Sequence, residues 1–184
     1  MEITILEMDK STIQYAKRTG SSFEVNSKLA LRAENGNIIY TVADVPSCTK
    51  QYGMEEYDPG SYVDHPDKAV FFAHVDEELA GQIRVSKHWN AYAYIDDIAV
   101  DAEYRRQGIG RALIERAIEW AKAKGFPGIM LETQDNNVPG CMLYERCGFE
   151  LCGFDTQLYK ALDPSTDEIA LYWYLIFGLH SLVE

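Results

Sequence analysis

The chain has 184 residues, enough for one domain with a single hydrophobic core. Hydrophobic residues make up 47% of it and charged residues 25%, which excludes an intrinsically disordered chain. The formal net charge of −12 disfavours nucleic acid and anionic membrane surfaces as partners and favours cationic ligands. We therefore expect one domain over residues 1–184, a monomer or homodimer, that binds a cationic small molecule and neither nucleic acid nor membrane.

The N-terminal half reads as strands joined by turns. "EITILEM" predicts a short strand, and "KLALRAENGNIIYTV" predicts a hairpin, because its Asn35-Gly36 pair readily takes positive φ angles. The stretch Val45–Asp67 is acidic and contains Pro and Gly, and it predicts a long loop with a short helix. "AVFFAHV" and "LAGQIRVS" predict a second hairpin around residues 76–78, and "AYAYIDDIAV" predicts the next strand.

Acidic residues concentrate between Met54 and Glu78. Two interpretations stay open: a solvated segment that keeps the protein soluble, or the entrance of a binding site that attracts a polycation. The residues concerned are Glu55, Glu56, Asp58, Asp64, Asp67, Asp76, Glu77 and Glu78.

The C-terminal half begins with a helical period. Apolar residues recur at helical spacing from Leu113 to Ala121, and Gly125 is placed to end the helix. "GIMLET" predicts a buried strand, followed by a short helix from about Val138 to Arg146 that closes at Gly148. "FELCGFDTQLYK" and "ALYWYLIF" predict two long final strands.

The segment "AVDAEYRRQGIGRALIERAIEWAKAKG", residues 99–125, runs from a strand through two glycines into this long helix. Such a loop is suited to bind an anion, because the free N–H groups and the positive dipole end of the helix point at the ligand. Glycine lets a phosphate come close to the backbone. A packing turn would explain a lone glycine pair equally well.

Arg105-Arg106-Gln107-Gly108-Ile109-Gly110 matches the R/Q-x-x-G-x-G/A signature of the GNAT superfamily of acetyl-CoA-dependent N-acetyltransferases. The order strand, loop, helix, strand, Asn-rich turn, Tyr-containing helix and Cys-Gly-Phe also resembles that fold. "HWNAYAYIDDIAV", "GIMLETQDNNVPGCMLYERCGF" and "ALYWYL" resemble the streptothricin acetyltransferases more narrowly, over roughly residues 20–176. The resemblance implies an α+β fold with a single mixed, mostly antiparallel central sheet, splayed in the middle and flanked by helices. The usual pair of helices after the first strand is not evident.

The resemblance implies that residues 99–147 form the acetyl-CoA-binding core. The glycine loop would bind the pyrophosphate through backbone N–H groups, and the pantetheine arm would run along a strand edge by β-augmentation. An N–H of that strand would stabilise the oxyanion. The implied cofactor-binding residues are Ile98, Ala99, Val100, Arg105, Arg106, Gln107, Gly108, Ile109, Gly110, Arg111, Asn137, Gly140 and Tyr144.

An amine acceptor must lose a proton before it attacks the thioester. Asp96 and Glu132 are the candidate bases, directly or through water, and acceptor binding or a structural salt bridge is the alternative for each. Two-residue alternation predicts that Asp96 shares a strand face with Tyr94 and Ile98 and that Asp97 points the other way. Tyr144 occupies the family position of the acid that protonates the leaving thiolate, and Trp89, Tyr92 and Tyr94 are candidates for the wall of the acceptor pocket, unless they are core residues.

Cys48, Cys141, Cys147 and Cys152 form no C-x-x-C pair, and no histidine lies at metal-ligand spacing, so we expect free thiols and no metal site. A covalent cysteine intermediate would need a histidine partner, and none is recognisable, which favours direct attack in a ternary complex. No apolar run is long enough to cross a bilayer and no secretory signal is evident, so we expect a cytoplasmic protein.

The leading hypothesis is an N-acetyltransferase that confers antibiotic resistance by acetylating a β-lysine amino group of streptothricins. The alternatives are a GNAT enzyme acting on a polyamine or a protein amine, and an acyl-CoA-binding module without turnover. A phosphate-loop nucleotidase is disfavoured, because G-x-x-x-x-G-K-[ST] is absent from the chain.

Overall fold

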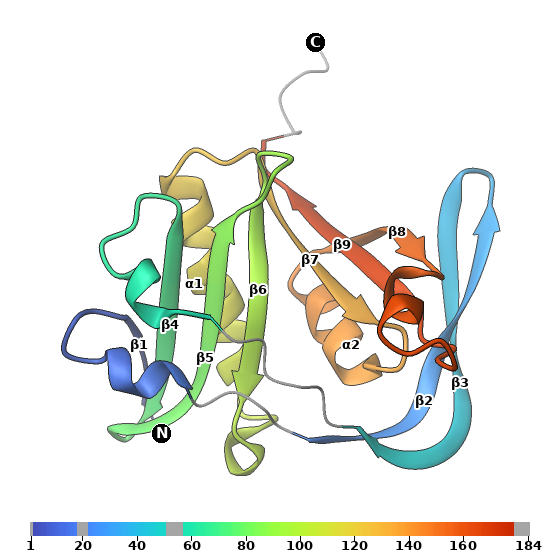
Figure 1. The fold of residues 1–184 in the computed structure, drawn as a ribbon, viewed down its shortest axis with the longest axis horizontal. Helices are drawn as coiled ribbons and strands as arrows, with labels where there is room; N and C mark the ends of the chain where they lie inside the picture. Colours follow the sequence, from blue (N-terminus) through green and yellow to red (C-terminus); the bar gives the residue numbers. More distant parts are fainter. Residues whose placement is uncertain (1, 18–21, 51–56, 179–184) are drawn as a thin grey trace. The chain divides into compact units, whose positions relative to one another are not determined.

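The computed structural model describes residues 2–17, 22–50 and 57–178. The chain divides into two compact units (Figure 1). The first unit comprises Met1–Ser21, Gln51–Ile129 and Ile176–Glu184, and the second comprises Ser22–Lys50 and Met130–Leu175. Among the described residues, no helix is long and apolar enough to cross a membrane.

The first unit is an antiparallel sheet with one long helix against it (Figure 1). Its strands lie in the order β1-β4-β5-β6. Hydrogen-bonded pairing starts at Ile3↔Val75 between β1 and β4, and continues with β4–β5 and β5–β6. The bounds are β1 Ile3–Glu7, β4 Lys68–Val75, β5 Glu78–Lys87, β6 Ala93–Val100 and α1 Ile109–Ala123, with short 3₁₀ helices η1 Ile13–Lys17, η2 Pro59–Tyr62 and η3 Ala102–Tyr104.

Helix α1 follows the predicted apolar period. Leu113, Ile114 and Ala117 are fully buried, and α1 packs against β1, β4, β5 and β6. Gly108 at its start and Gly125 after its end both have positive φ, +90° and +77°, which glycine adopts without a Cβ clash. The helix ends predicted from the glycines are therefore confirmed.

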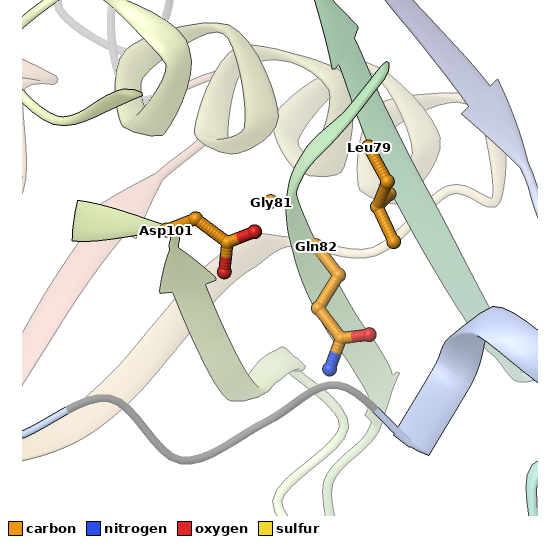
Figure 2. A pocket seen from close by; sticks show the side chains of 4 residues that line it. All are labelled: Leu79, Gly81, Gln82 and Asp101. Carbon is orange, nitrogen blue, oxygen red and sulfur yellow. The ribbon is translucent and has the colours of Figure 1, made fainter. Parts of the chain in front are cut away.

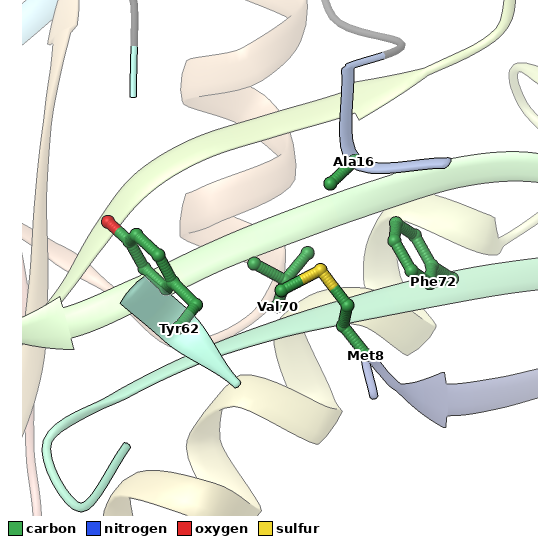
Figure 3. Close-up of a cluster of buried hydrophobic side chains, with 5 residues drawn as sticks. All are labelled: Met8, Ala16, Tyr62, Val70 and Phe72. Carbon is green, nitrogen blue, oxygen red and sulfur yellow. The ribbon is translucent and has the colours of Figure 1, made fainter. Parts of the chain in front are cut away.

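A second cluster covers another part of this unit's core. Met8, Ala16, Tyr62, Val70 and Phe72 pack together and bring η1 and η2 against β4 (Figure 3). The Tyr57 hydroxyl donates to the Ala16 carbonyl at 2.7 Å, which ties the segment entering η2 to η1. Apolar packing and this hydrogen bond therefore hold η1 and η2 against the sheet.

The second unit contains a long hairpin, a three-stranded group and a helix. The hairpin turns at Asn35 and Gly36, whose φ angles of 52° and 79° are positive as predicted. The strand order of the other group is β7-β9-β8. The bounds are β2 Phe23–Glu34, β3 Asn37–Lys50, β7 Gly128–Gln134, α2 Val138–Arg146, β8 Glu150–Asp155, η4 Leu158–Ala161 and β9 Ala170–Ile176.

The long loop predicted over Val45–Asp67 is partly wrong. Strand β3 continues through residue 50 despite Pro46. The pairing jumps from Val25↔Cys48 to Ser27↔Asp44, so proline stands at a register shift where no ladder N–H is required. The predicted short helix is present as η2, and residues 51–56 lie outside the described part of the chain.

The strand predicted over "FELCGFDTQLYK" is also too long. It ends at Asp155, and residues 158–161 form η4 instead. Oδ1 of Asp155 accepts hydrogen bonds from the N–H groups of Gln157 and Leu158, at 2.7 and 3.2 Å. An aspartate that captures the following amides turns the backbone out of the strand.

Candidate active site

The loop that leads into α1 has the backbone geometry expected of an anion site. Arg106 and Gly108 both have positive φ, 63° and 90°, which turns the chain sharply before the helix. No side chain caps the start of α1, and its first turn contains no acidic residue. A Cβ built on Gly108 would have no atom within 4 Å. The first N–H groups of α1 therefore have no side-chain cap, and a ligand could approach the backbone at Gly108 without meeting a side chain.

Three side chains of this loop are held by the protein itself. Arg105 Nε donates to the Val100 carbonyl at 3.0 Å, and Gln107 Nε2 donates to the Glu103 carbonyl at 2.9 Å. Arg111 Nε bonds Glu115 one turn later, at 2.7 Å. These bonds hold the three side chains against neighbouring parts of the chain. Ile109 is buried in the core, and Gly110 stands in the first turn of α1.

Ile98, Ala99 and Val100 form the end of β6 and pair with β5 as Ile83↔Ile98, Gln82↔Ala99 and Gly81↔Val100. A Cβ on Gly81 would lie 2.6 Å from the Ala99 carbonyl oxygen, so glycine permits the close approach of the two strands. Leu79, Gly81, Gln82 and Asp101 line a shallow pocket beside this pairing (Figure 2). It has no interior room for a water molecule, so it is not a ligand cavity.

The two-residue alternation predicted for Asp96 and Asp97 is only partly right: Asp96 shares the face of Tyr94, which pairs with Ser86, but Asp97 and Ile98 lie on the faces opposite to those predicted. Arg84 pairs with Asp97, but the next residue of β5, Val85, pairs with Ile95, so β6 carries one extra residue at Asp96. Ser86 Oγ donates to Asp96 Oδ1 at 3.0 Å. The bulge therefore turns Asp96 toward the sheet face that carries Ser86. Asp97 pairs with Arg84, so its side chain lies on that face too. Ile98 pairs with Ile83, on the other face.

Aromatic rings and a buried cation occupy this face of the first unit. The Arg84 guanidinium lies 4.2 Å from the Tyr57 ring centroid, and its side chain is 4% exposed. Burial raises the pKa of Tyr57, Arg84 lowers it, and Asp97 raises it. The sequence patterns did not single out Arg84, and its partner Tyr57 comes from a distant segment that only tertiary folding brings there.

The predicted acceptor-wall aromatics differ in their surroundings. Tyr94 stacks on His88 with ring centroids 4.6 Å apart, and His88 also contacts Trp89. The Trp89 side chain is 89% exposed at the β5–β6 turn, so within the first unit it walls no pocket. Tyr92 accepts a backbone bond from His88 in the same turn.

Part of the acidic segment has local structural roles. Asp58 caps η2 by accepting from the Gly60 N–H at 3.0 Å, and the Asp67 carbonyl accepts from the Lys87 N–H at 2.8 Å. Asp76 and Glu77 supply the positive φ angles of the β4–β5 turn. Glu55 and Glu56 lie outside the described residues.

In the second unit, Glu132 stands on β7 and is only partly exposed. The Tyr159 hydroxyl, from η4, donates to Glu132 Oε1. Burial raises the pKa of the Glu132 carboxyl, and the hydrogen bond from Tyr159 opposes that rise. A carboxyl with a raised pKa is a stronger base once it is ionised, which suits it to receive an amine proton.

Tyr144 lies on α2 with 6% of its surface exposed, and its ring contacts Phe149 and Trp173. Asn137 caps α2, since its Oδ1 accepts from the Gly140 N–H at 3.3 Å while its Nδ2 donates to Thr133 Oγ1 at 3.2 Å. A Cβ on Gly140 would come within 2.6 Å of the Asn137 amide, so glycine is required for this cap. The two residues thereby set the start of the helix that carries Tyr144.

Polar contacts that sequence patterns did not reveal hold the turn between β7 and α2. Asp135 is buried, and its Oδ1 accepts from the Ile169 N–H at 3.0 Å, while its carbonyl accepts from the Leu29 N–H at 2.9 Å. Asn136 Nδ2 donates to Glu168 Oε1 at 3.0 Å, and Lys50 pairs with the same carboxylate. These partners are far apart in sequence, so local patterns carry no signal for them.

The four cysteines are free thiols, as expected. Cys141 is fully buried, and burial, with Asp135 nearby, raises the pKa of its thiol to about 12. A thiol in that state is a poor nucleophile near neutral pH.

Each unit thus brings together part of the predicted site. The first unit holds the anion loop, the end of β6, Asp96 and Tyr94. The second holds Glu132, Asn137, Gly140 and Tyr144. Residues that the sequence patterns missed are Arg84, Tyr57, Asp135, Glu168 and Tyr159.

Comparison with known proteins gives a consistent result. A model of the acetyltransferase (GNAT) family matches residues 39–149. Streptothricin acetyltransferase A of Bacillus subtilis (strain 168) is 37% identical over 94% of this chain and 99% of that protein. [Ribosomal protein bS18]-alanine N-acetyltransferase of Escherichia coli (strain K12) is 35% identical over 43% of this chain and 53% of its own length.

Solved structures agree. A candidate streptothricin acetyltransferase from Bacillus anthracis str. Ames, in complex with acetyl coenzyme A, has a TM-score of 0.89 and 43% identity over 96% of this chain and all of that one. A nourseothricin acetyltransferase has a TM-score of 0.77 and 30% identity over 97% of this chain and all of that one. The chain therefore belongs to the GNAT family: it has the family's α+β fold and is an acetyl-CoA-dependent N-acetyltransferase.

Proposed function

We propose that this protein inactivates streptothricin antibiotics by acetylating an amino group of their β-lysine moiety. The observation that carries the proposal is the likeness to a streptothricin acetyltransferase over nearly the full length of both chains. The net charge of −12 supports it, since an acidic protein attracts the cationic β-lysine amines. We further propose that the chain is a single cytoplasmic catalytic domain, with residues 99–147 as its acetyl-CoA-binding core.

In this proposal the backbone of the Arg105–Arg111 loop binds the pyrophosphate, with Gly108 at its closest point. Asn137 and Gly140 preserve the start of α2, and Ile98, Ala99 and Val100 offer backbone groups to the pantetheine arm. Bound acetyl-CoA supplies the acetyl group as a thioester. A backbone N–H of β6 stabilises the negative charge that develops on the carbonyl oxygen.

Carboxylates receive the proton that the acceptor ammonium must lose. Glu132 is our first candidate, because burial raises the pKa of its carboxyl. Asp96 is the second, and the bulge in β6 places Asp97 on the same face, opposite Arg84. When the neutral amine attacks, the N–C bond forms, the C–S bond breaks, and Tyr144 donates its proton to the departing sulfur. The second proton that the nitrogen loses then restores the Tyr144 hydroxyl through solvent.

Direct transfer in a ternary complex is favoured over a cysteine intermediate. Burial raises the pKa of the Cys141 thiol to about 12, so almost none of it is thiolate near neutral pH.

A second candidate function is acetylation of a polyamine or a protein amine. The partial likeness to a ribosomal-protein alanine N-acetyltransferase supports it, but that likeness covers only 43% of this chain. A non-catalytic acyl-CoA-binding module is less favoured, because it does not need a carboxyl with a raised pKa such as that of Glu132.

The test is an acceptor panel. Purified protein is incubated with acetyl-CoA and, separately, a streptothricin, spermidine, a peptide with a free N-terminus and an aminoglycoside, and each mixture is followed by mass spectrometry and CoA release. We expect efficient acetylation of the streptothricin alone, because rigid aminocyclitol rings match the charge but not the shape of a β-lysine arm. Acetylation of spermidine or the peptide with the streptothricin left unmodified would favour the second function. If none of the acceptors raises the rate of CoA release above the rate measured without acceptor, the result would favour the non-catalytic module.

A further inference from the structure

A tyrosine outside every predicted motif contacts one of the candidate bases. The Tyr159 hydroxyl donates a hydrogen bond to Glu132 Oε1. The two residues are 27 positions apart, on η4 and β7 of the second unit. Both side chains are half-buried, so the bond is partly shielded from bulk water and is stronger than on an open surface.

The position of Tyr159 is set by its own short helix. Asp155 Oδ1 accepts from the amides of Gln157 and Leu158, and the Lys160 and Leu162 N–H groups bond the carbonyls of Gln157 and Tyr159 at 3.0 Å. The chain is thereby fixed on both sides of Tyr159. With the backbone of η4 fixed in this way, the Tyr159 hydroxyl is placed to orient the Glu132 carboxylate through Oε1.

Titratable groups of this unit that act on Glu132, or on a neighbour of Glu132, come from η4, β9 and β8. Tyr159 of η4 bonds it, Tyr172 of β9 lies within reach of its charge, and Asp155 of β8 acts on Tyr172. Burial raises the pKa of Tyr172, as do the charges of Glu132 and Asp155 and the neighbouring Tyr174, so that phenol stays neutral. The direct donor to Glu132 is therefore Tyr159.

We propose that Tyr159 is a positioning residue that keeps Glu132 ionised and oriented to accept a proton from the acceptor ammonium. The proposal rests on the function proposed above and goes beyond it by naming the group that prepares the base. Burial alone would favour the neutral carboxylic acid, which cannot accept a proton. The phenol hydrogen bond favours the charged carboxylate, so the two effects together leave Glu132 both ionised and basic.

The proton balance follows directly. One N–H bond of the acceptor ammonium breaks and an O–H bond forms on Glu132, while Tyr159 keeps its own proton. Glu132 then releases the proton to solvent after transfer. Tyr159 touches no reacting atom in this scheme, so its removal affects the ionisation of the base and leaves the acetyl-CoA site unchanged.

The first experiment compares Tyr159→Phe with Tyr172→Phe across pH. Each variant loses one phenolic oxygen near Glu132, but Tyr159→Phe alone removes a hydrogen bond to it. We expect Tyr159→Phe to move the acid limb of kcat/KM to higher pH, with a loss of roughly tenfold on that limb. The rate should recover at alkaline pH, and the dissociation constant of acetyl-CoA should not change. Tyr172→Phe should keep the parent profile, and an equal shift in both variants would overturn the proposal.

The second experiment does not depend on acetylation. The Glu132 carboxyl is titrated by carbon NMR in protein labelled at glutamate, with Glu132→Gln assigning the signal. We expect Tyr159→Phe to raise its pKa and Tyr172→Phe to leave it in place. An unchanged Glu132 titration in Tyr159→Phe overturns this inference even if streptothricin is the acceptor. A shifted titration with no streptothricin product supports the role of Tyr159 on Glu132 and counts against the proposed acceptor alone.

Discussion

Gly108 and Gly125 form a matched pair at the two ends of α1, and they separate cofactor binding from folding. Both have positive φ, +90° and +77°, and a Cβ built on either has no atom within 4 Å. Gly108→Ala and Gly125→Ala therefore impose the same kind of backbone strain without a steric clash. Only Gly108 lies in the loop that we assign to the pyrophosphate.

The cost to stability should be similar in the two variants. An L-residue in the left-handed region costs about 1–2 kcal/mol, so each variant should unfold a few degrees earlier than the parent. The cost to acetyl-CoA binding should differ. A methyl group at position 108 holds the phosphate away from the backbone, and losing a hydrogen bond to a charged group costs roughly 1.5–3 kcal/mol. That corresponds to an affinity loss of roughly tenfold to a hundredfold.

Isothermal titration with acetyl-CoA measures the affinities, and thermal unfolding measures the stabilities. We expect Gly108→Ala to bind acetyl-CoA at least tenfold more weakly and Gly125→Ala to bind like the parent, at equal loss of stability. Parent-like binding by a folded Gly108→Ala variant would refute the placement of the pyrophosphate. Equal weakening in both variants would show that the loss reflects strain in α1 and not contact with the ligand.

Two further predictions concern the second unit. Tyr144→Phe should lower kcat, because it removes the hydroxyl that we propose as the proton donor to sulfur. It should keep acetyl-CoA affinity, because the ring still contacts Phe149 and Trp173. Equal turnover at every pH would mean that Tyr144 serves only in packing. Iodoacetamide near neutral pH should alkylate the exposed Cys48 but spare Cys141, whose pKa is raised to about 12 by burial, and Cys141→Ala should still transfer acetyl; loss of all transfer in a folded Cys141→Ala protein would favour a covalent cysteine route.

Features coded by short stretches were predictable from the sequence. The Asn35-Gly36 hairpin, the α1 period and the α2 bounds of Val138–Arg146 agree with the structure, because turns and helices depend on neighbouring residues. The short strand-ending turn at Asp155 also had a local signal, in an aspartate followed by a small polar residue, which the strand pattern concealed.

Features set by strand pairing were not predictable. The bulge at Asp96 depends on the register between β5 and β6, and it reversed the predicted face of Asp97. The Tyr159–Glu132 bond and the cluster around Asp135 join residues that are far apart along the chain. Side-chain partners of this kind depend on tertiary packing, so a periodic pattern cannot reveal them.

The measurement that bears most directly on the central claim is the location of the acetyl group on a streptothricin product. Streptothricin is incubated with the protein and acetyl-CoA, the product is purified, and tandem mass spectrometry assigns the modified fragment. We expect a single acetyl group on an amino nitrogen of the β-lysine moiety, with no product from Glu132→Gln above a small residual rate. An acetyl group elsewhere in the antibiotic, or an unmodified streptothricin beside an acetylated polyamine, would contradict it.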